Sequence, residues 1–220
     1  MDKNRKISIL IAAVVILLIA GVGAIIYYAM TAEARYMAKA AKENPQGEKL
    51  MQQYNDAKAK LKTNPEDFGA YFDIGFVKNE FKDYKGAVEA YQNSIKYNSN
   101  SIIAYNNMAD DYTKLKDYPD AEAAYMKSLQ IASNYMPTYY ALVDLYQNYY
   151  TDKKMVTERV LQDGLKANPN DQNLLSLLAG YYRDTKQNDK AIATYEEILK
   201  LRPDDKVLQD EVNSLKNGGQ

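Results

Sequence analysis

The stretch that decides the fold is residues 102–135, IIAYNNMADDYTKLKDYPDAEAAYMKSLQIASNY. Taken alone, it predicts two short amphipathic helices separated by a Lys-Asp-Tyr-Pro turn. The same residue types recur 34 positions away on both sides, because Tyr105 is preceded by Tyr71 and followed by Tyr139. A fixed period of this length indicates a stacked array of helical hairpins, and it outweighs any local interpretation.

The repeated positions combine small and aromatic residues in a way that explains how the two helices of a unit would pack. Each first helix carries a small residue, and each second helix carries an alanine followed four positions later by a tyrosine: Gly75, Ala109 and Ala179, then Ala87 and Tyr91, Ala121 and Tyr125, Ala191 and Tyr195. Small residues allow close approach of the helices, and a single unit cannot bury its apolar face alone. This pattern resembles the tetratricopeptide repeat, which implies an all-α, right-handed superhelix of helix-turn-helix units.

The repeat register divides most of the chain into units and caps. It predicts four units, over residues 68–101, 102–135, 136–171 and 172–205. Residues 31–67 are interpreted as a helical linker and a degenerate N-terminal cap or partial repeat, because 35–42 lacks the aromatic signature. Residues 206–220 are interpreted as a capping helix and tail, with Val207, Leu208, Val212 and Leu215 on roughly one face.

The third unit departs from the pattern. Leu129 and Leu165 are 36 residues apart, whereas the regular interval is 34. We therefore expect two inserted residues, within 150–154. The small position of the second helix then falls on Thr157, and the aromatic position falls on Leu161.

The N-terminal region has a different character. Residues 1–6 form a short basic segment, and residues 7–30 contain no charged side chain. As a helix, the second segment would be about 36 Å long, enough to cross a hydrocarbon core of about 30 Å. We interpret it as a transmembrane signal anchor, with a cleaved signal peptide or a buried helix as alternatives. The denser basic cluster before it favours a cytoplasmic N-terminus and an extracytoplasmic repeat domain in a single-pass cell-membrane protein.

Composition argues against several classes of function. The chain has no cysteine, no histidine and a net charge of -1, which disfavours thiolate or imidazole chemistry and nucleic-acid binding. We expect no catalytic residue, no cofactor and no metal site. Asp110-Asp111 and Asp204-Asp205 could be read as catalytic carboxylates, but we place Asp111 on a helix surface and Asp204-Asp205 at a helix start.

The resemblance also implies a binding surface, because first helices line the concave groove of such arrays. By register, the candidate groove residues are Phe72, Phe76, Asn79, Glu80, Asn106, Asp110, Lys114, Tyr140, Asp144, Gln147, Asn148 and Arg183. The two phenylalanines either form an exposed apolar anchor or are covered by the N-terminal cap. The carboxylate clamp of the family is not evident, and Asp110 and Asp144 favour a protein or peptide partner with basic residues.

These features predict a membrane-anchored adaptor or scaffold that contacts the lipid bilayer through residues 7–30. Its layout resembles bacterial membrane-anchored tetratricopeptide-repeat proteins with one N-terminal span, which suggests envelope biogenesis, secretion or complex assembly. One alternative is a homo-oligomeric, self-assembling structural subunit of an envelope complex. A less favoured alternative is an enzyme that uses carboxylates alone.

Overall fold

The computed structural model describes residues 32–218, and the segment predicted to span a membrane, 7–30, lies outside this range. Within it, the chain is helical throughout and contains no strand. A helix covers residues 32–43, and the further elements are α2 Gly47–Thr63, α3 Phe68–Glu80, α4 Tyr84–Tyr97, α5 Ile102–Lys114, α6 Tyr118–Ile131, α7 Met136–Asp144, η1 Leu145–Tyr149, η2 Thr151–Val156, α8 Thr157–Ala167, α9 Gln172–Asp184, α10 Asn188–Leu201 and α11 Lys206–Lys216. None of the helices in residues 32–218 has the length and apolarity that a membrane crossing requires.

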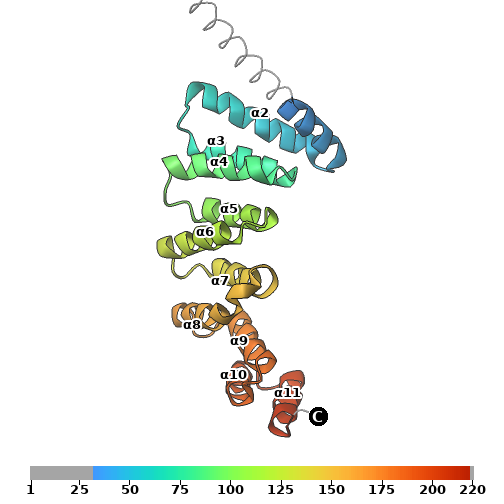
Figure 1. Ribbon diagram of the computed structural model, residues 1–220, viewed down its shortest axis with the longest axis vertical. Coiled ribbons are helices and arrows are strands. Elements are labelled where there is room, and N and C mark those ends of the chain that lie inside the picture. The colour runs from blue at the N-terminus through green and yellow to red at the C-terminus, as the bar shows by residue number, and fades with distance from the viewer. Residues whose placement is uncertain (1–31, 219–220) are drawn as a thin grey trace, which may run out of the picture.

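The helices stack as hairpins along the long axis of the molecule (Figure 1). The pairs α3–α4, α5–α6 and α9–α10 form regular units. The helix α4 packs against α5, and the irregular third unit lies between α6 and α9 and contacts both. The helix over 32–43 and α2 lie at one end, while α11 lies at the other (Figure 1). The prediction of an all-α repeat solenoid is therefore confirmed.

Side-chain caps and left-handed turn residues set the helix ends. Asp67, Asp171 and Asp205 each accept a hydrogen bond from the backbone N–H three residues later, which satisfies a donor that the helix start leaves free. Between the two helices of a unit, Lys82, Lys116 and Lys186 adopt φ angles of 60–63°. These turn residues occupy one register position in units one, two and four.

The small residues of the repeat make room for the aromatic ones. A Cβ added at Gly75 would lie 2.7 Å from the Tyr91 ring, and Tyr91 itself is 1% exposed. Ala87, Ala121 and Ala191 are each fully buried. The helices of a unit are therefore as close as the sequence pattern predicts.

A pair of glycine substitutions tests this close approach. We expect Gly75→Ala to destabilise the protein by about 1–3 kcal/mol, because the Tyr91 ring must move. Gly180→Ala is the matched control, since no atom lies within 4 Å of a Cβ there, and it should stabilise the protein by about 0.5–1 kcal/mol. Thermal melts followed by circular dichroism measure both. Equal effects of the two substitutions would contradict the packing account.

The insertion in the third unit is absorbed by irregular helix. Leu145–Tyr149 forms a π-helical turn, in which the Tyr150 N–H donates to the Leu145 carbonyl at 2.6 Å, and Thr151–Val156 forms a 3₁₀ helix. Thr157 and Leu161 are fully buried, as the displaced register predicts. The π turn changes the direction in which side chains at the end of the first helix point, and such turns are frequent at functional sites.

Two sequence predictions are wrong. Asp111 is not on a helix surface but is 0% exposed. Val207 is 79% exposed, whereas Val212 is buried and Leu208 and Leu215 pack partly against the core. The α11 helix meets α10 along a narrower stripe than its apolar residues suggest, because it has a neighbour on one side only.

Candidate functional site

A hollow of about 380 Å³ lies where the first helices of units one to three meet. We call it the central hollow. Its walls come from α3, α5, α6, α7 and η1, and they are formed by Asn79, Asp110, Thr113, Lys114, Tyr125, Ala141, Asp144, Leu145 and Tyr149. Four of these residues, Asn79, Asp110, Lys114 and Asp144, are candidate groove residues from the sequence. The repeat register thus places residues from three units around one space.

The polar groups of the central hollow are held by hydrogen bonds. The Tyr125 hydroxyl donates to the Asp110 carboxylate, and the Asn148 amide donates to Asp144 at 2.6 Å. Desolvation raises the pKa of Asp110; the Tyr125 bond and Lys114 oppose this increase, while the charge of Asp144 adds to it. The hollow therefore contains two carboxylates that interact and one ammonium group, which favours a cationic guest.

The irregular third unit contributes an aromatic wall. Tyr149 ends the π turn and is 43% exposed. Its ring centroid lies 6.4 Å from that of Tyr118, and the Tyr150 ring lies 5.9 Å from Tyr118 on the same side. An exposed tyrosine face beside carboxylates suits the stacking of a cationic side chain.

Asn79 connects the central hollow to a buried carboxyl group. Its amide donates to Asp111 Oδ1 at 2.5 Å, while Asp111 Oδ2 has no hydrogen-bond partner. Burial raises the pKa of Asp111 to about 7, and the charges of Asp110 and Asp83 act in the same direction. The Asp111 carboxyl group therefore titrates near neutral pH, directly behind the wall of the hollow.

The sequence contained a signal for Asp111 that its analysis missed. The same register position holds Val77, Leu145 and Tyr181 in the other units. All three of these residues are buried. An aspartate at a position that is otherwise apolar indicates a buried charge rather than a surface residue.

The two phenylalanines lie outside the central hollow. Phe72 is half-buried and tilts against Tyr91, with a ring centroid distance of 5.5 Å. Phe76 is also half-buried and packs against the core that contains Met37 and Leu50 of the N-terminal hairpin. Both rings contribute to cores, and their role in binding stays a prediction.

Other candidate groove residues connect neighbouring units. Asn106 donates to Ser128 and accepts from Thr138, and Tyr140 donates to Asp171 at 2.7 Å. Arg183 pairs with Asp184 and Glu211. The register alone could not reveal these contacts, because it does not show which polar side chains form hydrogen bonds or ion pairs within the array. Of the remaining candidates, Glu80 and Asn148 are exposed and Gln147 is half-buried.

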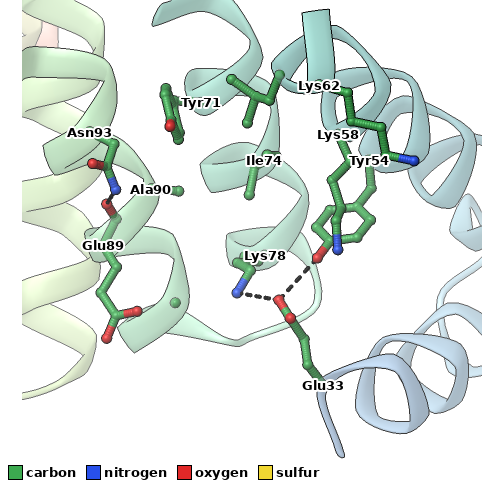
Figure 2. Close-up of a pocket in the computed structure, with 12 residues that line it drawn as sticks. Glu33, Tyr54, Lys58, Lys62, Tyr71, Ile74, Lys78, Glu89, Ala90 and Asn93 are labelled. Carbon is green, nitrogen blue, oxygen red and sulfur yellow. Dashed lines mark hydrogen bonds and ion pairs between the residues drawn. The ribbon is translucent and has the colours of Figure 1, made fainter. Parts of the chain in front are cut away.

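A second space, with a separate set of lining residues, lies between α2, α3 and α4 (Figure 2). This cleft has a volume of about 420 Å³, and Leu61 and Ile74 line it together with Lys58 and Lys78. A similar cleft of about 480 Å³ is lined by Leu129 and Leu142. These residues stand 68 positions, or two repeats, after Leu61 and Ile74. Within residues 32–218, no cluster of three or more acidic side chains could hold a metal ion.

Comparisons with known proteins agree with this geometry. Residues 102–135 and 173–205 match the sequence model of the tetratricopeptide repeat. No curated protein matches the chain in sequence. Solved structures with a similar fold include MamA, at 15% identity and a TM-score of 0.57 over 67% of this chain and 85% of that one. They also include YrrB, described as a tetratricopeptide-repeat protein with an unusual peptide-binding site, at 15% identity and a TM-score of 0.55 over 74% and 84%. A tetratricopeptide-repeat protein from Parabacteroides merdae matches at 15% identity and a TM-score of 0.59 over 82% and 72%.

Proposed function

Since this chain is a tetratricopeptide-repeat protein, we propose that it is a non-catalytic scaffold that holds a protein or peptide partner in the central hollow. The observation that carries this proposal is the convergence of Asn79, Asp110, Lys114 and Asp144 from three consecutive units on one space. Recognition by several units favours an extended segment, which can contact each unit in turn. The YrrB structure, with its peptide-binding site, is a precedent on the same fold.

The partner segment carries a lysine or arginine side chain. Asp110 and Asp144 supply two carboxylates against the one ammonium of Lys114. A cation in the hollow would lower the raised pKa of Asp110, because it would offset the desolvation of that carboxylate. The exposed ring of Tyr149 adds a surface on which a guanidinium can stack.

The scaffold is attached to the cell membrane by residues 7–30, with the repeats on the extracytoplasmic side. The uncharged run of these residues and the basic residues before it support this part of the proposal. Protease treatment of sealed, right-side-out spheroplasts tests it. The repeat domain should be digested in intact spheroplasts, and its protection there would reverse the orientation.

Two substitutions in the central hollow should change binding in opposite directions. Asp144→Asn removes an attractive charge and should weaken the binding of a cationic peptide by about tenfold, while Lys114→Gln removes a repulsive charge and should strengthen it by a similar factor. Fluorescence anisotropy of the full chain in detergent micelles measures this, with a labelled Gly/Ser peptide that carries three spaced arginines.

The controls separate local from general electrostatics. Asp163→Asn changes the same charge in the separate cleft of about 480 Å³ and should leave binding unchanged. A peptide in which citrulline replaces each arginine should not bind. Equal effects of Asp144→Asn and Asp163→Asn would show that only net charge matters, which would refute the central hollow as the site.

A further inference from the structure

Units three and four are joined to their predecessors by a repeated polar contact. The Tyr146 hydroxyl donates to Glu122 at 2.7 Å, and the Tyr182 hydroxyl donates to Glu158 at 2.9 Å. In each pair the tyrosine lies near the end of a first helix, and the glutamate lies on the second helix of the unit before it. A lysine completes each contact, with Lys153 at 2.8 Å from Glu122 and Lys190 at 3.2 Å from Glu158.

Unit one has a similar contact between a glutamate, a tyrosine and a lysine, but these residue types stand at different positions. Lys78 stands 68 residues before Tyr146, and Tyr54 stands 68 residues before Glu122. The acid comes instead from the helix over 32–43: Glu33 Oε1 accepts from the Tyr54 hydroxyl at 2.9 Å and lies 2.8 Å from the Lys78 ammonium (Figure 2). We call Glu33, Tyr54 and Lys78 the N-terminal clasp.

The surroundings of Lys78 are shaped for this contact. The Lys78 side chain is 13% exposed, and its ammonium also pairs with Asp83 at 3.3 Å. A Cβ on Gly86 would lie 2.7 Å from that ammonium, so glycine leaves the space that Lys78 occupies. Burial opposes the charge of Lys78, but the Glu33 and Asp83 carboxylates outweigh it and raise its pKa.

Further contacts hold the helix over 32–43 in one position. The Tyr36 hydroxyl donates to the Phe81 carbonyl at 2.7 Å, at the turn between α3 and α4. Met37 is 1% exposed and belongs to the core formed by Leu50, Tyr54 and Phe81. Apolar burial supplies attraction without direction, whereas the N-terminal clasp and the Tyr36 bond fix the angle of the helix.

We propose that the helix over 32–43 is a rigid mount, and that the N-terminal clasp sets the orientation of the repeat array relative to this helix. The replacement of the tyrosine of units three and four by Lys78, and of the glutamate before them by Tyr54, adapts unit one to contact with the helix over 32–43. The mount does not depend on what the hollow binds.

Spin-label distances test the mount directly. The chain has no native cysteine, so Lys39→Cys and Lys96→Cys place one label on the exposed face of the helix over 32–43 and one on α4. Double electron–electron resonance on the full chain in detergent micelles gives the distance distribution. We expect a single narrow distribution in the parent, and roughly a doubling of its width with Lys78→Met or Glu33→Gln.

The matched control is Lys190→Met, which breaks the counterpart contact to Glu158 in unit four and should leave the width unchanged. Circular dichroism checks that each variant is folded, and Glu33→Gln decides the outcome if Lys78→Met does not fold. A broad distribution in the parent would overturn the proposal. So would widths in both clasp variants that equal the width of the parent.

Discussion

Replacement of Tyr125 by alanine is expected to destabilise the protein by about 3–5 kcal/mol, the range for a buried aromatic side chain. Tyr125 is 3% exposed in the core of unit two, where it packs beside the fully buried Ala121. Its hydroxyl also donates to Asp110, so the substitution removes that hydrogen bond from the carboxylate. The effect therefore combines a cavity with a lost hydrogen bond.

The position of Tyr125 in the array determines the form of the transition. Each unit contacts its neighbours only, so damage to unit two should uncouple the N-terminal units from units three and four. We expect a broad or two-step melt in circular dichroism. Ala121→Leu should produce the same form through overpacking, at a cost of about 1–3 kcal/mol.

Tyr149→Ala is the control, because that tyrosine is 43% exposed and its loss should cost less than about 1 kcal/mol. Comparable destabilisation by Tyr125→Ala and Tyr149→Ala would contradict the assignment of the core. A sharp, single transition for Tyr125→Ala would contradict the neighbour-only coupling of the units.

Replacement of Asp111 by asparagine is expected to stabilise the protein above neutral pH. Its pKa is about 7 in the folded protein and about 3.9 in an unfolded chain. The folded state therefore binds more protons between these values, and the free energy of unfolding falls as the pH rises from about 4 to 7. The difference of about 3 units corresponds to about 4 kcal/mol, from which the unpartnered amide of asparagine subtracts about 1–3 kcal/mol.

The net gain for Asp111→Asn is thus about 1–3 kcal/mol at pH 8. At pH 4, where the wild-type carboxyl is already neutral, only the cost of the amide remains, and the substitution should destabilise the protein by about 1–3 kcal/mol. Urea denaturation at both pH values measures it. Asp144→Asn, which makes the same charge change at an exposed position, is the control. A gain for Asp111→Asn that is equal at pH 4 and pH 8 would refute the burial of a titrating charge.

The sequence predicted the repeat array well because packing repeats with the sequence. Gly75, Ala121 and Tyr125 each represent a register position that has the same structural role in other units. Because these positions recur about every 34 residues, the sequence reveals both the helices and their contacts. The two-residue displacement of the second helix in unit three was also predicted, since Thr157 and Leu161 occupy the shifted buried positions, although the π turn lies at 145–149, before the range 150–154 expected for the insertion. The π turn itself could not be predicted, because the same two extra residues could have formed a longer loop.

The candidate site was less predictable, because the register of the groove does not show which side chains already form hydrogen bonds within the array. Asn106 bonds to Thr138 of the next unit and Tyr140 bonds to Asp171 at the start of α9, whereas Asp110 and Asp144 converge on the central hollow. Asp111 and the N-terminal clasp were missed for a related reason. Both consist of residues that differ from the repeat at positions where the other units are regular, and an analysis based on similarity between units passes over them.

Photo-crosslinking in membranes of the source cells tests the central claim, that the partner lies in the central hollow. A photoreactive amino acid at Tyr149 reports from the wall of the hollow, and one at Met126 reports from the separate cleft of about 480 Å³. The two positions are matched in exposure, at 43% and 41%. We expect an adduct from position 149 that contains a lysine- or arginine-bearing segment, disappears with Asp144→Asn and is absent from position 126. Adducts from position 126 with none from position 149 would contradict the proposed function.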